Sequence, residues 1–212
     1  MTIGLLFGTF DPVHEGHVEI ANNGILTDLV DQVWFVITPE NPFKKGKIIT
    51  SQEHRLAMVN LAVEGYINFV ASDIEFQLPN PQYTVNTLRH LKNKHSEYNF
   101  LIIMGSDNYG GLLADEWKDS EYILKNFQIC VYQRTDENLV IGEEIDPLIL
   151  LPNHIQLPGD IIQWSSSWIR STIRHYRNLE GTSIDDLTPL IERPFFNQKV
   201  LEYIQSHKLY IE

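Results

Sequence analysis

The chain has 212 residues, with 16 basic and 28 acidic side chains and a formal net charge of −12. Because a nucleic-acid-binding surface normally carries a basic stripe, this balance argues against a broad one here. The 43% hydrophobic and 21% charged content is ordinary for a globular protein, and no apolar stretch approaches the ~20 residues of a membrane span.

A single cysteine, Cys130, excludes an intramolecular disulfide framework. No basic segment with a cleavage site, as in a secretory signal, is visible at the N-terminus. We therefore expect a soluble cytoplasmic protein that binds neither nucleic acid nor membrane; whether it forms a homo-oligomer is left open. This length fits a single α/β domain, with a Rossmann-like core over about 1–160 and a small helical C-terminal subdomain over about 161–212.

Short apolar runs bounded by glycine, proline or polar residues predict strands over residues 3–7, 32–37, 67–71, 74–76, 99–104 and 128–132. Apolar positions at helical spacing predict helices over residues 18–26, 51–63, 83–91, 117–124, 166–176 and 194–207. Residues 135–152 are weakly patterned and are expected to form an irregular excursion. The alternation of strands and helices predicts a doubly wound, parallel α/β sheet with right-handed crossovers.

Between the first predicted strand and helix lies the decapeptide GTFDPVHEGH, residues 8–17, with His14 and His17 three residues apart. Ligands of open α/β sheets bind at the carboxyl ends of strands, and a helix N-terminus favours an anion. Two histidines at this junction therefore suit phosphate. They could also ligate a metal, for which Asp11 and Glu15 are the obvious nearby carboxylates, or simply flank a helix cap. The Gly-Thr turn in front of them favours phosphate.

A small phosphorylated substrate needs only a few basic groups in one cleft, even in an acidic protein. The candidates are Lys44, Lys45, Lys47, Arg55, Arg134, Arg170 and Arg174. For Lys45, Lys47 and Arg174 we prefer the interpretation as solvated surface charges.

His-x-Gly-His after Gly-Thr-Phe-Asp-Pro resembles the signature of the adenylyltransferase and cytidylyltransferase superfamily of nucleotidyltransferases. The full decapeptide is most similar to that of the bacterial nicotinate-nucleotide adenylyltransferases. The family often has two glycines before the Thr, and Phe7 takes the first place here. The resemblance implies that Gly8, Thr9 and Phe10 help to bind ATP, and that His14 and His17 contact its triphosphate.

Two further segments resemble parts of the same family. The loop Asn41-Pro42-Phe43-Lys44 keeps the lysine of the family's Pro-Pro-His-Lys but lacks its histidine. The resemblance implies that Lys44 reaches the phosphates, although a lysine in a stiff proline loop is equally typical of a mobile surface side chain. Tyr83-Thr84 resembles the family's Ser-Tyr-Thr, which receives the nicotinate mononucleotide; from spacing alone, Thr84 is more typical of a helix cap.

Gly105-Ser106-Asp107 follows the most hydrophobic predicted strand and resembles the family's Gly-x-Asp. That resemblance assigns Gly105 and Asp107 to the adenosine side of ATP; an isolated Gly-Ser-Asp would more simply be a turn with an Asp cap. Trp117 is similar to the family's tryptophan that stacks on the pyridine ring, and ordinary core packing is the alternative.

Ser165-Ser166-Ser167-Trp168-Ile169-Arg170 places several hydroxyl and amide donors at a helix start, with Arg170 about one turn inside. A helix cap with a solvated arginine would explain this pattern. The segment also resembles the family's Ile-Ser-Ser-Thr-x-Ile-Arg, which grips the ATP triphosphate. Trp164 replaces the family's Ile, and Ser167 replaces its Thr.

The resemblance implies transfer of AMP from ATP to nicotinate mononucleotide, giving deamido-NAD and pyrophosphate. His14, His17, Lys44 and Arg170 would be catalytic, Lys44, Tyr83, Thr84 and Trp117 would bind the acceptor, and Mg²⁺ would arrive with ATP. Two alternatives stay open. One is a related enzyme acting on nicotinamide mononucleotide, phosphopantetheine or a polyol phosphate, and the other is a non-catalytic nucleotide-binding regulator.

Overall fold

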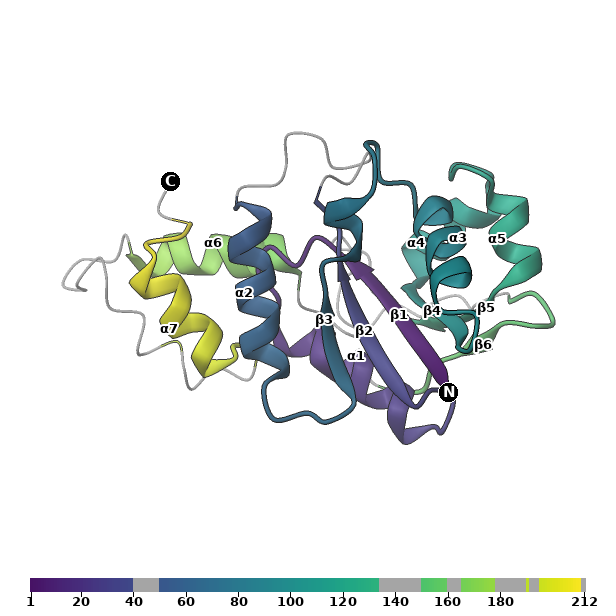
Figure 1. Cartoon of the computed structure of the whole chain (residues 1–212). Coiled ribbons are helices and arrows are strands. Elements are labelled where there is room, and N and C mark those ends of the chain that lie inside the picture. Colours follow the sequence, from purple (N-terminus) through teal and green to yellow (C-terminus); the bar gives the residue numbers. More distant parts are fainter. Residues whose placement is uncertain (40–49, 134–149, 160–164, 178–189, 191–194, 211–212) are drawn as a thin grey trace.

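The computed structural model describes residues 1–39, 50–133, 150–159, 165–177, 190 and 195–210. Six strands within these ranges form one sheet in the order β3-β2-β1-β4-β5-β6, and every neighbouring pair is parallel (Figure 1). They are β1 (Thr2–Gly8), β2 (Gln32–Ile37), β3 (Phe69–Ser72), β4 (Asn99–Gly105), β5 (Gln128–Tyr132) and β6 (Ile155–Gln156). This topology confirms the predicted doubly wound α/β sheet.

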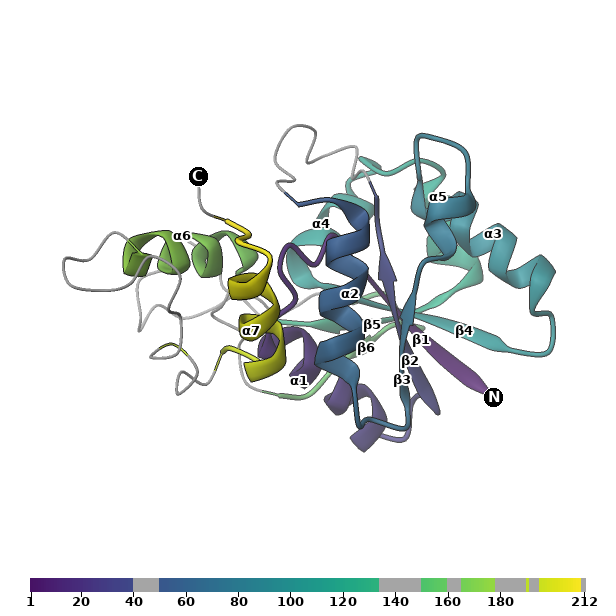
Figure 2. The same cartoon turned by 60° about the vertical axis from the view of Figure 1, so that its left-hand side comes forward.

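Helices cover both faces of the sheet. They are α1 (Glu15–Leu26), α2 (Gln52–Val63), α3 (Thr84–Lys94), α4 (Ser106–Leu113), α5 (Ser120–Asn126), α6 (Ser166–Arg177) and α7 (Gln198–Ser206), together with the 3₁₀ turn η2 (Ile74–Gln77). Figures 1 and 2 show α1 and α2 on one face, where α6 and α7 extend the layer outward, and α3, α4 and α5 on the other.

Each layer buries its own apolar cluster against the sheet. Along β1, Ile3 and Leu5 pack toward α3, α4 and α5, whereas Leu6 packs toward α1 and α2. Successive side chains of a strand point to opposite faces, so a strand covered on both sides reads as a continuous apolar run. This is why residues 3–7 were recognisable as a buried strand.

The C-terminal helix α7 packs against α2. Leu201 and Ile204 of α7 are fully buried in the cluster that contains α1 and α2. Polar contacts flank this apolar seam: Lys199 Nζ lies 2.7 Å from Glu64 Oε2, and the Tyr203 hydroxyl lies 2.9 Å from His54 Nδ1. Helix α7 is therefore attached to the parallel sheet by way of α2.

Three sequence predictions of secondary structure were wrong or incomplete. Residues 74–76 are not a strand, because Phe76 N–H bonds back to the Asp73 carbonyl and turns the chain into η2. Helix α4 was missed because Gly110 and Gly111 lower its helix propensity. The helix predicted from residue 117 begins at Ser120, after a turn that contains left-handed residues.

The remaining predicted helices and strands are present with boundaries shifted by a few residues, and the two-residue strand β6 is additional. Most of the weakly patterned stretch 135–152 lies outside the described residues. Within the described ranges, no helix combines the length and the apolar character needed to cross a membrane.

Candidate nucleotide site

The carboxyl ends of the central strands meet at one edge of the sheet. Gly8 at the end of β1 lies opposite Ile37 of β2, and Gly105 at the end of β4 lies opposite Tyr132 of β5. Strands β1 and β4 are neighbours, and the chain winds outward in opposite directions from them. In such sheets the crevice outside this pair of strand ends is where ligands bind.

His14 and His17 lie against each other at the start of α1. Their ring centroids are 3.8 Å apart, and the His14 backbone N–H donates to His17 Nδ1 across 3.2 Å. Because Nδ1 accepts this hydrogen bond, the proton of a neutral His17 resides on Nε2. His14 is buried and His17 is half-buried. The pair therefore presents an imidazole N–H donor beside a helix N-terminus, the arrangement expected for phosphate contact.

Phe10 shapes the turn in front of the histidines. It has φ of 48°, which is strained for a bulky residue, and its ring is 1% exposed. The ring packs edge-on against His17 at 5.0 Å between centroids. A Cβ atom on Gly8 would lie only 2.8 Å from Phe10 Cζ. A methyl group at position 8 would therefore overlap the buried phenyl ring, which favours glycine there.

Arg55 ties together three segments at this edge of the sheet. Its buried guanidinium donates to the carbonyls of Thr9 at 2.7 Å, Thr38 at 2.7 Å and Pro39 at 2.9 Å, and Nε donates to Thr50 at 3.2 Å. Burial lowers the pKa of Arg55, and the nearby Asp11 carboxylate opposes that change. The suggestion that Arg55 belongs to a phosphate cleft is corrected: it braces the backbone on which the cleft is built. No spacing rule in the sequence could have shown these carbonyl partners.

The N-terminus of α6 docks onto the same loop. Ser166 Oγ donates to the Pro12 carbonyl at 3.0 Å, and Arg170 Nη1 donates to the Asp11 carbonyl at 2.6 Å. Ser165 acts as the helix cap, because its Oγ accepts the Trp168 N–H at 3.1 Å. The serine–arginine segment and the histidine decapeptide, more than 150 residues apart in sequence, are therefore in direct contact.

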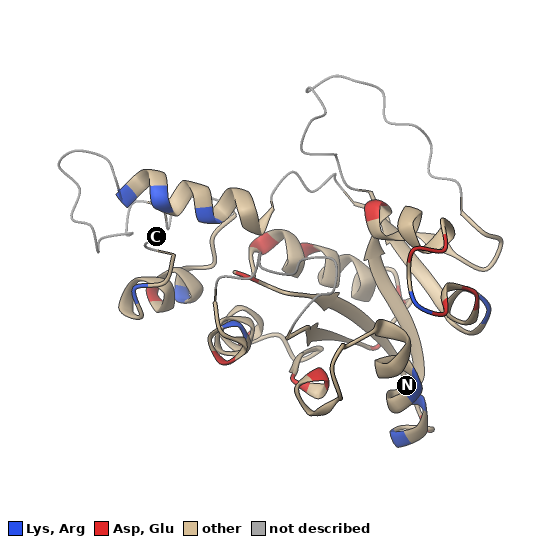
Figure 3. Cartoon of the chain, turned by 90° about the horizontal axis from the view of Figure 1, so that it is seen from above, with Lys and Arg blue, Asp and Glu red and all other residues tan. Residues whose placement is uncertain are grey.

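Positive charge gathers on α6. This helix carries Arg170, Arg174 and Arg177 and no acidic residue, in a chain of net charge −12 (Figure 3). Arg177 is buried, and its Nη1 donates to the Leu209 carbonyl at 2.8 Å. Arg170 is half-buried with its guanidinium on the loop after β1. A local positive field of this kind attracts anions despite the acidic exterior.

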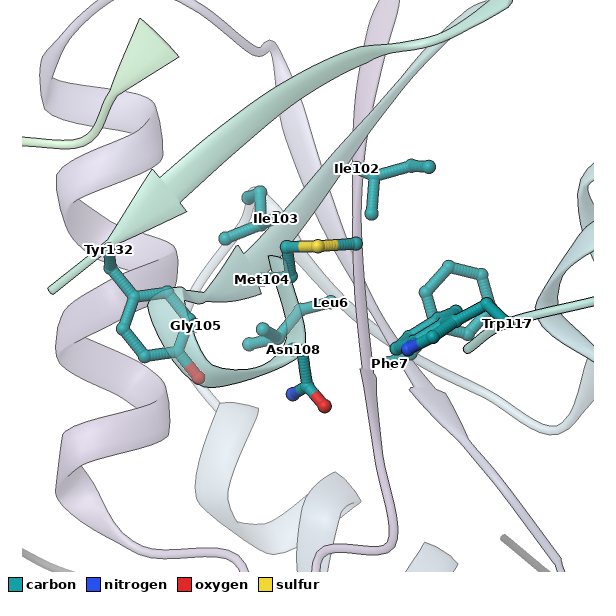
Figure 4. A pocket seen from close by; sticks show the side chains of 9 residues that line it. All are labelled: Leu6, Phe7, Ile102, Ile103, Met104, Gly105, Asn108, Trp117 and Tyr132. Atoms are coloured by element: carbon teal, nitrogen blue, oxygen red, sulfur yellow. The ribbon is translucent and has the colours of Figure 1, made fainter. Parts of the chain in front are cut away.

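A pocket opens between the ends of β1, β4 and β5. It is lined by Leu6, Phe7, Ile102, Ile103, Met104, Gly105, Asn108, Trp117 and Tyr132 (Figure 4). Gly105 and Trp117, which the sequence assigned to adenosine and pyridine, thus border one pocket. Phe7, which stands where the family has glycine, supplies an aromatic wall. Apolar and aromatic linings with a few polar groups suit a flat heteroaromatic ring. Asp107 is exposed in the first turn of α4.

Tyr83 and Thr84 lie at the start of α3. Tyr83 occupies the cap position and Thr84 is the first helical residue, so the prediction that Thr84 caps this helix was wrong. The Tyr83 N–H bonds to the Pro81 carbonyl at 2.9 Å, and α3 starts one residue earlier than it would with a Thr84 cap. Lys118 Nζ lies 4.7 Å from the centre of the Tyr83 ring. The residue after Trp117 therefore reaches the start of α3.

Glu75 is a buried carboxyl group behind this part of the site. It is 1% exposed, and Thr87 Oγ1 donates to its Oε1 at 2.6 Å. Burial raises the pKa of Glu75 to about 7, against the opposing effects of hydrogen bonds from Thr87 and Thr38. Thr38 follows β2 and Thr87 lies in α3, so Glu75 joins two segments of the candidate site.

Lys44 and Trp164 lie outside the described residues, so the structure does not place the predicted phosphate lysine. Over the described ranges, no group of three or more His, Cys, Asp or Glu side chains could hold a metal ion.

A parallel sheet of this order, with a histidine pair, an arginine and an aromatic pocket at its switch point, defines a nucleotide-binding α/β protein of the doubly wound class. The model of the family described as "Cytidylyltransferase-like" matches residues 5–182. A "Probable nicotinate-nucleotide adenylyltransferase" of Flavobacterium psychrophilum is 41% identical over 210 residues, covering 99% of each chain. One of Bacteroides fragilis is 40% identical over 170 residues, covering 80% of this chain and 81% of its relative.

The chain therefore belongs to the cytidylyltransferase-like family, within its group of nicotinate-nucleotide adenylyltransferases. The solved structure of Plasmodium falciparum nicotinic acid mononucleotide adenylyltransferase complexed with APC superposes with a TM-score of 0.71 at 19% identity. That alignment covers 99% of this chain and 96% of the other, and it shows that the two share their fold.

Proposed function

We propose that this protein transfers the AMP group of ATP to nicotinate mononucleotide, forming deamido-NAD and pyrophosphate. Relatives that are 37–41% identical over nearly their whole length carry the name of this activity. One structural observation carries the proposal at the level of the site. The segment after β1 carries His14 and, in the first turn of α1, His17, and its Asp11 carbonyl binds Arg170, so imidazole and guanidinium donors lie near one strand end.

The chemistry requires no protein nucleophile. A phosphate oxygen of the mononucleotide attacks the α-phosphorus of ATP, a new P–O bond forms, and the bond to the oxygen that bridges to the β-phosphate breaks. Catalysis then consists of positioning and of stabilising the negative charge that develops on the leaving pyrophosphate. We assign this stabilisation to the Nε2–H of His17, to His14 and to Arg170, with Lys44 as a further cation.

The other predicted residues divide between the two substrates. For ATP we assign the backbone of the turn Gly8-Thr9-Phe10, the hydroxyl groups of residues 165–167, and Gly105 with Asp107 toward the adenosine. Because the Phe10 ring is buried and the Thr9 carbonyl accepts from Arg55, these two residues act through the shape of the turn. For nicotinate mononucleotide we assign Lys44, Tyr83 and Thr84, with the Trp117 indole against the pyridine ring.

Mg²⁺ enters this proposal as part of the substrate MgATP. We place the reaction in the cytoplasm, which suits a chain whose single cysteine, Cys130, is a buried free thiol.

The proposal is tested by measuring pyrophosphate release from MgATP with nicotinate mononucleotide, nicotinamide mononucleotide and phosphopantetheine as acceptors. We expect the nicotinate substrate to be turned over fastest. His17→Ala should lower kcat by about 100-fold to 1,000-fold while MgATP binding and the melting temperature are largely kept. His175→Ala, which removes an exposed imidazole of α6, is the matched control and should be unchanged. Near-normal turnover by His17→Ala would remove the assigned role.

A further inference from the structure

The side chain of Tyr210 contacts the loop between β1 and α1, just ahead of the two histidines. Its hydroxyl donates to Asp11 Oδ1 at 2.8 Å, across 199 positions of sequence. Both side chains are buried, with Tyr210 3% exposed and Asp11 2% exposed. Burial and the adjacent Asp11 carboxylate raise the pKa of Tyr210 above its ordinary value, so the phenol keeps its proton and acts as the donor.

The backbone around Tyr210 is held independently of this hydroxyl. The Leu209 carbonyl accepts from Arg177 of α6 at 2.8 Å, and the Leu209 N–H bonds to the Ile204 carbonyl at 3.0 Å. Tyr210 itself adopts a left-handed conformation with φ of 62° that turns the chain after α7. The ring is therefore anchored by its neighbours, and its hydroxyl can be removed without removing the anchor.

Asp11 touches Arg170 in two different ways. Arg170 Nη1 donates to the Asp11 carbonyl at 2.6 Å, whereas the distance from Nη1 to the carboxylate oxygen Oδ2 is 3.9 Å. The short contact fixes the guanidinium through a neutral carbonyl, and the carboxylate stays at the outer limit of an ion pair. A closer ion pair with Asp11 would neutralise the positive charge of Arg170 and weaken its attraction for an anionic ligand.

We propose that Tyr210 is a positioning residue for nucleotidyl transfer: by holding Asp11 Oδ1, its hydroxyl keeps the carboxylate from closing onto Arg170, which thus retains its charge for the triphosphate of ATP. This inference rests on the proposed function, because that function makes the triphosphate the ligand of Arg170. Tyr210 thereby affects the affinity for ATP through the loop that follows β1.

The test compares Tyr210→Phe with wild type by calorimetric titration with MgATP. Removing only the hydroxyl should raise the Kd for MgATP by about fivefold to tenfold, the size of a typical net hydrogen-bond contribution. Tyr203→Phe is the matched control, because it removes a hydroxyl that contacts His54 on the α2–α7 surface. It should bind MgATP as wild type does.

A double-mutant cycle separates positioning from a loss of stability. In an Arg170→Gln background, Tyr210→Phe should cause no further weakening of MgATP binding, because the charge through which it acts is already gone. A further weakening equal to that seen in the wild-type background would overturn the inference, as would an unchanged Kd for Tyr210→Phe itself. If wild type binds no MgATP, the proposed function fails together with this inference. If wild type binds and Tyr210→Phe binds equally well, only the inference fails.

Discussion

Glu75→Gln tests the electrostatic cost of burying a carboxyl group between the end of β2 and α3. The native pKa of Glu75 is about 7, raised from 4.5 by burial. The difference corresponds to about 3 kcal/mol of unfolding free energy, at about 1.36 kcal/mol for each pKa unit. Because burial is nearly complete, solvent screening does not reduce this value greatly.

The sign follows from the order in which the two states ionise. Below pH 4.5 the carboxyl is protonated in both the folded and the unfolded chain, and Glu75 carries no ionisation penalty. As pH rises from 4.5 to about 7, the carboxyl group ionises in the unfolded chain but stays protonated in the folded chain. The free energy of unfolding therefore falls over this range. Above about pH 7 the loss is complete. A glutamine at position 75 does not titrate and still offers an oxygen to Thr87.

Urea unfolding of wild type and Glu75→Gln between pH 5 and pH 8 measures this effect directly. The variant should be close to wild type in stability at pH 5 and more stable by up to about 3 kcal/mol at pH 8. Glu19→Gln, at an exposed position of α1, controls for the change in net charge and should show no comparable trend. A stability difference between Glu75→Gln and wild type that does not vary with pH would refute the reasoning.

Three further substitutions probe the framework and the pocket. Arg55→Met should destabilise the fold by roughly 3–5 kcal/mol in urea unfolding, because it strips four carbonyls of a charged donor; a loss below about 1 kcal/mol contradicts the bracing role. Gly8→Ala should cost about 1–3 kcal/mol and lower kcat, because its methyl group pushes the Phe10 ring toward His17. Gly110→Ala, with open space around its Cβ, should cost nothing, and equal effects at both glycines would refute the clash. Trp117→Ala should raise the KM for nicotinate mononucleotide about tenfold with little change for ATP; an equal rise for both substrates would place the indole elsewhere.

Local pattern was enough to predict the central fold. The apolar runs of β1, β2, β4 and β5 mark strands covered on both faces, and the topology follows from their alternation with helices. The same pattern could not distinguish the strand expected at residues 74–76 from η2. That choice depends on the partners of Glu75, which come from α3 and from the end of β2.

The polar residues of the candidate site were predictable where they lie in short motifs. His14 and His17, or Ser165 and Arg170, are close in sequence, and each pair lies at a strand end or a helix start. Asp11, Arg55 and Tyr210 were not predicted in their observed roles, because their contacts join distant segments. A buried arginine bound to backbone carbonyls carries no sequence signal that separates it from a phosphate ligand.

The products formed from MgATP and nicotinate mononucleotide test the central claim most directly. Chromatography with mass detection should show deamido-NAD accumulating in equal amount with pyrophosphate, and more slowly formed dinucleotide when nicotinamide mononucleotide is supplied instead. Pyrophosphate without a dinucleotide, or faster turnover of the amide substrate, would contradict the account.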